Sequence, residues 1–148
     1  MPTHKDLLEN LDHCLCTNLR RAARVVTAAY DESFRPLGLK ATQVIVLVSI
    51  AKTGSPTINA LSARMGMDRT TMTRNLKPLE RGGYLRVGVG KDKRVRVVEL
   101  TTKGQGLLQK AYPLWKKRQA ALVKNVGAKD CVDLFTKIDH LIGAFDGR

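Results

Sequence analysis

The chain has 148 residues, of which 43% are hydrophobic and 26% charged, as is ordinary for one globular domain. Its net charge of +13 is not ordinary, and it favours a polyanionic partner. The longest uncharged apolar run, residues 41–51, is too short to span a bilayer, and the first residues lack a signal-peptide core. The sequence therefore predicts a cytoplasmic protein with no membrane partner.

The first half of the chain reads as three helices. Apolar side chains recur at helical spacing over residues 5–34 without an internal Gly or Pro, which predicts one long amphipathic helix. Residues 35–38, Arg-Pro-Leu-Gly, should end it. Residues 40–52 are apolar on most sides and should form a buried central helix. After a turn at residues 54–56, Thr57 is the predicted N-cap of the next helix.

A helix-turn-helix is predicted over about residues 57–81. Gly66 permits the tight turn, and Asp68 can cap the second helix by accepting hydrogen bonds from its first amides. Three apolar residues of that helix should face inward, namely Met72, Leu76 and Leu79. Its opposite face carries side chains that suit a DNA major groove, where arginine binds guanine and threonine reaches methyl groups and phosphates. These predicted contacts are Arg69, Thr70, Thr73, Arg74 and Lys77.

Two prolines fall inside predicted helices. Pro78 lacks an amide and should clash with the carbonyl of Arg74, which predicts a kink or an early 3₁₀ turn. Such a turn would make Lys77 and Glu80 irregular as groove contacts. Pro113 should bend a long helix that begins after Thr101 or Thr102.

A two-stranded wing is predicted over about residues 84–100, because the apolar period changes from 3.6 to 2 after Gly82-Gly83. The tip between the strands is Lys91-Asp92-Lys93-Arg94. From Arg64 to Lys103 there are 11 basic and 4 acidic residues, so a net +7 lies on 40 residues. The other basic side chains of the wing should contact backbone phosphates or simply solvate the strands; they are Arg86, Lys91, Lys93 and Arg96.

A helix-turn-helix, a Gly-Gly pair, a wing with Asp92-Lys93-Arg94, and then Leu-Thr-Thr-Lys-Gly at residues 100–104 together resemble the MarR family of bacterial transcription regulators. The resemblance covers nearly the whole chain. It implies one domain over residues 1–148, mainly α (α+β), with a winged helix-turn-helix at 40–103. It also implies that Arg94 enters the minor groove while Asp92 orients its guanidinium.

The resemblance further implies dimerisation through the terminal helices, at residues 5–34 and 104–146. Each carries an apolar face longer than the compact middle of the chain can cover, which independently favours a twofold partner. The alternative is that the two faces pack on each other within one monomer. A dimer would present two reading heads to a near-palindromic duplex, with half-sites about 10 bp apart.

Two kinds of signal are considered for regulation. Family members often bind small aromatic acids between the dimer helices and the winged helix, and the candidate residues here are Asn18, Arg21, Thr42 and Trp115. One branch of the family senses peroxide through a cysteine near the start of the first helix, a role open to Cys14 and Cys16. On one continuous helix these two would point about 200° apart and could not easily bridge, so bystander cysteines are the favoured interpretation.

The sequence thus predicts a homodimeric, sequence-specific, DNA-binding regulator of double-stranded operators, a repressor released by a small effector and associated with the nucleoid when bound. The alternatives are redox sensing and non-specific binding of nucleic acid, the latter disfavoured because Tyr84 is the only aromatic residue in the basic region. An enzyme is rejected, since the three histidines and three cysteines match no triad or metal spacing. No cofactor or metal is expected.

Overall fold

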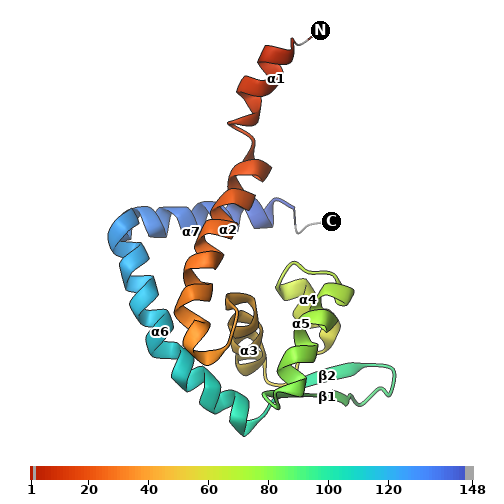
Figure 1. Cartoon of the computed structure of the whole chain (residues 1–148). Coiled ribbons are helices and arrows are strands. Elements are labelled where there is room, and N and C mark those ends of the chain that lie inside the picture. Colours follow the sequence, from red (N-terminus) through yellow and green to blue (C-terminus); the bar gives the residue numbers. More distant parts are fainter. Residues whose placement is uncertain (2, 146–148) are drawn as a thin grey trace.

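The computed structural model describes residues 1 and 3–145, and it confirms a mainly helical fold with a two-stranded antiparallel sheet (Figure 1). The predicted helix end at residue 146 lies outside the described residues. The elements are α1 (His4–Leu11), α2 (Leu15–Phe34), the 3₁₀ helix η1 (Arg35–Leu37), α3 (Ala41–Thr53), α4 (Ile58–Arg64), α5 (Arg69–Arg81), β1 (Leu85–Val89), β2 (Arg96–Leu100), α6 (Thr102–Val126) and α7 (Ala128–Gly143).

The core is centred on α3, which contacts α2, α4, α5, α6 and β2. Its side chains Val46, Leu47 and Ile50 are completely buried. The prediction that α3 is apolar and buried on most sides is only partly correct, because Ile45 is 53% exposed and Val48 36% exposed. These two line a cavity instead, as described below.

The predicted long first helix is wrong in one respect, because it is broken at residues 12–14 into α1 and α2. Cys14 adopts an extended backbone (φ −70°, ψ 119°) and is the N-cap of α2. The Asn18 side-chain amide donates to the carbonyls of Asp12 and Cys14, at 2.8 and 3.0 Å. It thereby gives hydrogen-bond partners to two carbonyl oxygens at the break. No Gly or Pro lies at the break. Asn10, Asp12 and His13 are weak helix formers, and their closeness in the chain explains the break.

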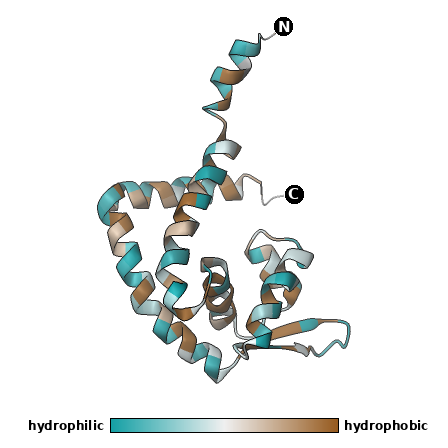
Figure 2. Ribbon diagram, viewed as in Figure 1, coloured by the Kyte–Doolittle hydropathy of each residue, from teal (hydrophilic) through white to brown (hydrophobic). Residues whose placement is uncertain are grey.

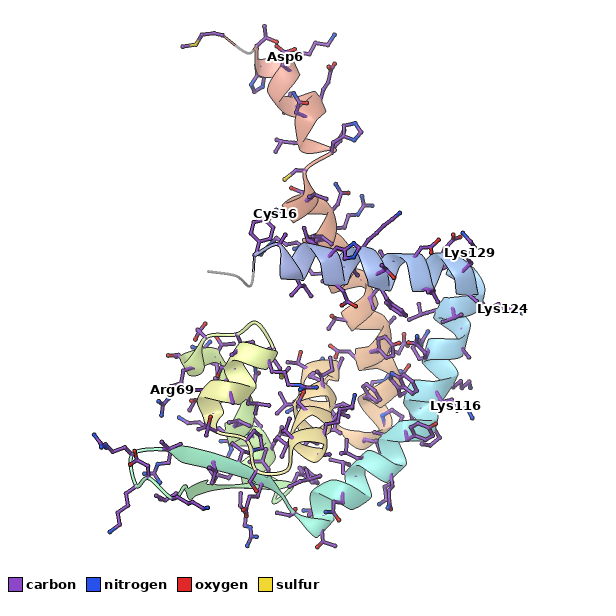
Figure 3. The ribbon with its side chains drawn as sticks, turned by 180° about the vertical axis from the view of Figure 1, so that it is seen from behind. Asp6, Cys16, Arg69, Lys116, Lys124 and Lys129 are labelled. Carbon is purple, nitrogen blue, oxygen red and sulfur yellow. The ribbon has the colours of Figure 1, made fainter. Side chains whose placement is uncertain are left out.

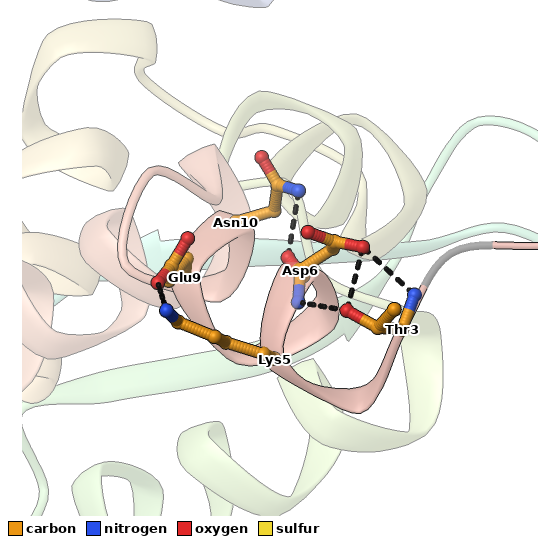
Figure 4. A network of polar contacts seen from close by, with 5 residues as sticks. All are labelled: Thr3, Lys5, Asp6, Glu9 and Asn10. Atoms are coloured by element: carbon orange, nitrogen blue, oxygen red, sulfur yellow. Dashed lines mark hydrogen bonds and ion pairs between the residues drawn. The ribbon is translucent and has the colours of Figure 1, made fainter.

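Helix α1 is held together by its own polar residues and projects away from the rest of the molecule (Figure 1). Thr3 and Asp6 form a capping box, in which the Asp6 amide donates to the Thr3 hydroxyl and the Thr3 amide to the Asp6 carboxylate (Figure 4). Lys5 and Glu9 add an ion pair at 3.8 Å. An eight-residue helix without tertiary packing is marginal in water.

The two prolines inside helices, Pro78 in α5 and Pro113 in α6, differ in their effect on helix geometry. Helix α5 continues as α-helix through Pro78 to Arg81, so the predicted 3₁₀ turn is absent from this helix. Pro78 is exposed, and water can satisfy the Arg74 carbonyl that lacks its helical donor. Helix α6 bends along its length, the effect expected of Pro113 (Figure 1).

Apolar side chains on α1, α2 and α7 remain exposed in the single chain. Hydrophobic residues recur along these three helices (Figure 2). Leu15 is 65% exposed, Phe135 is 53% exposed, and no residue of α7 is buried. The alternative that these faces pack on each other within one monomer therefore holds only for the contact between α2 and α6, and not for α1 or α7. Within the described residues no single helix is long and apolar enough to cross a membrane. One pair of helical segments, Leu15–Leu37 and Ala41–Thr53, would be long and apolar enough together, but the pair is bent by 80°.

Candidate nucleic-acid interface

Helix α5 is fixed at its start by Asp68, as predicted. The Asp68 carboxylate accepts from the Thr71 amide and the Thr71 hydroxyl, both at 2.8 Å. These bonds to the charged form, the amide bond first, hold the pKa of Asp68 below its usual value of 3.8. Met72, Leu76 and Leu79 are buried and lock the helix to the core, so its rotation about its own axis is set.

The opposite face of α5 brings together all five residues predicted to meet a major groove. They line one shallow surface concavity: Arg69, Thr70, Thr73, Arg74 and Lys77. Thr73 is half-buried and its hydroxyl donates to the Arg69 carbonyl at 2.8 Å, which leaves its oxygen lone pairs and methyl group for a partner. Asn75 lies off this face, with its amide directed at the Met67 sulfur at 3.6 Å. Arg69 projects on the same side as the wing (Figure 3).

Asp92 and Arg94 are in contact with each other at the wing tip. The Arg94 amide donates to the Asp92 carboxylate at 2.9 Å, and the Arg94 Nε lies 3.5 Å from the same oxygen. The Arg94 side chain is 93% exposed. An exposed ion pair of this kind contributes little to stability, and the orientation of the guanidinium by Asp92 stays a prediction from the family resemblance.

The strand register separates the two arginines of the wing strands. Arg86 pairs with Glu99 and Arg96 pairs with Val89, so these two arginines lie on opposite faces of the wing. Arg86 also forms a 3.6 Å ion pair with Glu99, which reduces its availability to a phosphate. Arg96, Lys91 and Lys93 are exposed and have no ion pair in the described part of the chain.

Sequence reasoning missed the contacts that join α5, and the turn after it, to β1 and to the start of α6. The Glu80 carboxylate accepts from the Val87 amide at 3.3 Å and so bridges α5 and β1. Lys103 donates to the Gly82 carbonyl at 2.7 Å. The Lys103 Nζ also lies 4.9 Å from the centre of the Tyr84 ring. The Leu-Thr-Thr-Lys-Gly pattern drew attention to this segment, but spacing along the chain does not show which carbonyl a lysine reaches.

A second hollow lies between α2 and α6 on one side and α3 and α4 on the other, with a volume of about 750 Å³. Its walls are mainly apolar, and its aromatic members are Tyr30, Phe34, Tyr112 and Trp115. The rings of Tyr112 and Trp115 stack with centroids 5.9 Å apart. Burial raises the pKa of Tyr30, and its hydroxyl donates to the Gln119 side-chain oxygen, so it stays neutral.

Of the four residues predicted to bind an effector, the structure places Trp115 on the wall of this cavity. Asn18 caps the break between α1 and α2 instead, and Arg21 and Thr42 are not among the lining residues. The basic residues at the cavity are Lys52 and Arg64, which sequence reasoning missed. They close α3 and α4, and nothing in the local sequence distinguishes them from ordinary basic residues in a last helical turn.

The cysteines differ from their predicted setting. Because Cys14 is an extended N-cap, the argument that Cys14 and Cys16 point to opposite sides of one helix does not apply. The Thr17 amide, followed by the Thr17 hydroxyl, lowers the pKa of the Cys14 thiol, although no hydrogen bond of ordinary geometry caps α2 there. Cys131 lies in α7, and all three thiols are free.

A basic recognition helix on a helix-turn-helix, flanked by a wing with a basic tip, defines a winged helix-turn-helix DNA-binding protein. Residues 37–95 match the model of the MarR family. A crystallised transcriptional regulator of M. tuberculosis, MosR, is 40% identical with a TM-score of 0.81, over 93% of this chain and 98% of that one. A second structure of MosR, in complex with DNA, is 41% identical with a TM-score of 0.72, over 86% and 98% of the two chains.

A mutant MarR from E. coli complexed with operator DNA is 25% identical, with a TM-score of 0.81, over 89% of this chain and 96% of that one. The regulator YwoH of Bacillus subtilis is 29% identical over 91 residues, which is 62% of this chain and 66% of that protein. The chain belongs to the MarR family. It is a DNA-binding transcriptional regulator of this type, and its relatives are regulators and not enzymes.

Proposed function

We propose that the protein is a homodimeric repressor that binds a pseudo-palindromic operator in the cytoplasm. The observation that carries this proposal is the exposed basic face of α5, which is accompanied by an exposed arginine, Arg94, at the wing tip. Two such surfaces reach one duplex only if two chains assemble, and the open apolar faces of α1, α2 and α7 supply an interface for that assembly.

The test is a titration of the purified protein against its own upstream intergenic DNA, with a scrambled duplex of equal length and composition, at two salt concentrations. Preference for the intergenic duplex at both salt concentrations supports operator recognition. Affinity should fall steeply with salt, since each phosphate contacted by a lysine or arginine releases counterions. Equal affinity for the two duplexes would show instead that the net charge alone drives binding.

We further propose that the apolar cavity binds a small aromatic acid that releases the operator. Its aromatic walls suit an aromatic ring, and Lys52 and Arg64 supply positive charge for a carboxylate. The cavity is shared by α2 and α6, which belong to the proposed dimer arms, and by α3 and α4 of the winged helix-turn-helix. A ligand that fits only one relative position of these two parts would therefore shift the spacing of the reading heads.

Trp115 provides the readout for this proposal, because it is the only tryptophan and lines the cavity. Titration with benzoate or salicylate should change its fluorescence, and Arg64→Gln should weaken that binding about tenfold through loss of one charge-assisted contact. Benzyl alcohol, which keeps the ring and lacks the carboxylate, is the control. Equal effects of the acid and the alcohol would exclude a carboxylate site.

Redox sensing is a second candidate, favoured by the position of Cys14. A thiol with a lowered pKa is present more often as the reactive thiolate, and the extended N-cap frees its direction from the helix that carries Cys16. Hydrogen peroxide would take two electrons and two protons from the thiols and be reduced to two waters, leaving a Cys14–Cys16 disulfide.

Peroxide treatment should then remove two free thiols per chain and lower operator affinity in the wild type and in Cys131→Ser. In Cys14→Ser and in Cys16→Ser the disulfide cannot form, so peroxide should neither remove two thiols as a disulfide nor lower operator affinity. Retention of all three thiols after treatment, measured by maleimide labelling and mass spectrometry, would exclude this candidate.

A further inference from the structure

The turn that ends the recognition helix α5 is bonded on two sides: the amides of residues 82–84 donate to carbonyls of α5, and the carbonyls of the same residues are bonded by the start of α6. Three successive carbonyls follow the helix, and each accepts a hydrogen bond from residues 101–103. Lys103 Nζ donates to the carbonyl of Gly82, and the Thr101 hydroxyl donates to that of Gly83, each at 2.7 Å. The Thr101 amide donates to the Tyr84 carbonyl at 3.1 Å.

The two segments are also in close contact without room for a side chain. A Cβ atom added at Gly104 would lie 2.0 Å from the Tyr84 carbonyl oxygen, so the backbone of α6 rests directly on residue 84. Gly83 has a φ of +73°, which lets the chain reverse there and presents its carbonyl to Thr101. Interfaces packed this tightly behave as rigid joints and not as hinges.

Lys103 has a distinct position in this joint. Its ammonium lies at the carbonyl end of α5, where the helix macrodipole favours positive charge. It also sits over the Tyr84 ring, 4.9 Å from the ring centre. Lys103 has no carboxylate partner in the part of the chain that the structure describes, so its charge meets the Gly82 carbonyl and the Tyr84 ring without a competing ion pair.

We propose that Lys103 is a positioning residue that sets the angle between the dimer arm α6 and the recognition helix α5, and hence the spacing of two recognition helices on DNA. This inference rests on the proposed function, because spacing has meaning only for a dimer on two half-sites. In a dimer joined through its arms, a small rotation at residues 82–84 is carried to the far end of each α5. The half-site separation that the protein prefers is then fixed at this joint.

The test uses Lys103→Met, which keeps an unbranched stem and removes the ammonium, and Lys110→Met as the matched control. Lys110 is an exposed lysine of the same helix with no hydrogen bond or ion pair among the described residues. The probes are the duplex that the wild type selects from a random-sequence pool, and the same duplex with one base pair inserted between its half-sites. The insertion rotates one half-site by about 35° relative to the other.

Wild type and Lys110→Met should discriminate strongly against the inserted duplex. Lys103→Met should bind the selected duplex about tenfold more weakly, the size of effect expected for one charge-assisted hydrogen bond, and should discriminate less against the insertion. Lys103→Arg should restore both, since a guanidinium can also donate to the Gly82 carbonyl. Circular dichroism at the assay temperature shows that each variant is folded.

Several outcomes would overturn the inference. Discrimination by Lys103→Met equal to that of the wild type would show that the ammonium does not set spacing. An equal loss of affinity on every duplex, with a salt dependence reduced by about one counterion, would show that Lys103 is a phosphate contact. A wild type that selects no sequence overturns the proposed function and this inference together, whereas a selective wild type with an unaffected Lys103→Met overturns the inference alone.

Discussion

Arg94 is the residue whose replacement should reduce operator affinity most specifically. It is almost fully exposed, so its removal costs no packing, and its Nε lies 3.5 Å from the Asp92 carboxylate. Arg94→Ala should weaken operator binding by about 1–3 kcal/mol, the range for one specific arginine contact, as measured by fluorescence anisotropy. Arg94→Lys should restore only the non-specific part, because a lysine lacks the planar fork.

The neighbouring lysine gives the matched control for this prediction. Lys93→Ala removes the same charge from the same tip, so it should weaken binding to operator and scrambled duplex alike and lower the salt dependence by about one. If Arg94→Ala and Lys93→Ala have the same profile across both duplexes, Arg94 is an ordinary phosphate contact.

Asp68 makes the start of α5 sensitive to acid. Its pKa is lowered in the folded chain by the Thr71 amide, so its stabilising contribution is complete above its ordinary value of 3.8 and is lost as the pH falls through the lowered value. Asp68→Asn keeps a good N-cap and has no charge to titrate. The difference in Tm between wild type and Asp68→Asn should therefore be constant near neutral pH and change only below about pH 4.

At the scale of elements, the packing of α6 on the wing junction predicts opposite effects for two glycines of one helix. Gly104→Ala places a methyl group into the Tyr84 carbonyl and should destabilise the fold by about 1–3 kcal/mol in urea unfolding, as overpacking does. Gly106→Ala, which meets nothing within 4 Å, should stabilise it by about 0.5–1 kcal/mol through the helix preference of alanine. Similar values for the two would show that the contact at Tyr84 yields easily.

Local signals predicted the elements that local interactions determine. Thr57 and Asp68 were recognisable as N-caps, and the structure shows both accepting the expected amides. The switch to a period of two located the wing because alternating burial is a property of neighbouring residues. The face of α5 followed from three buried positions on one helix, which is why its five outward residues were named correctly as one surface.

What the sequence did not show depends on contacts between distant segments or on small energetic differences. Lys52 and Arg64 reach the cavity beside Trp115 from two other helices, and no spacing along the chain encodes that meeting. The break before Cys14 arises from several weak helix formers in succession, each costing only tenths of a kcal/mol. The exposure of Ile45 and Val48 was hidden because a helix beside a cavity has the same apolar composition as a buried one.

At the scale of the whole molecule, the open apolar faces and the DNA-reading surface depend on each other. A single chain offers one recognition helix and one wing, and linking two such heads raises the effective affinity for a two-half-site operator by about 10²–10⁴ without new contacts. Many apolar residues of α1, α2 and α7 are left uncovered in the single chain, and exposed groups of this kind usually mark an interface.

Phe135→Glu tests this dependence, because it introduces a charge at an exposed apolar position of α7 without disturbing the buried core. Burying an unpaired carboxylate between two chains is costly, so the variant should sediment as a monomer at concentrations where the wild type is a dimer. Its operator affinity should fall about a hundredfold through loss of linkage, while its affinity for an isolated half-site stays unchanged. Ala51→Glu adds the same charge on the exposed side of α3 and should leave the assembly intact. A dimeric Phe135→Glu variant with full operator affinity would show that α7 does not join the two chains.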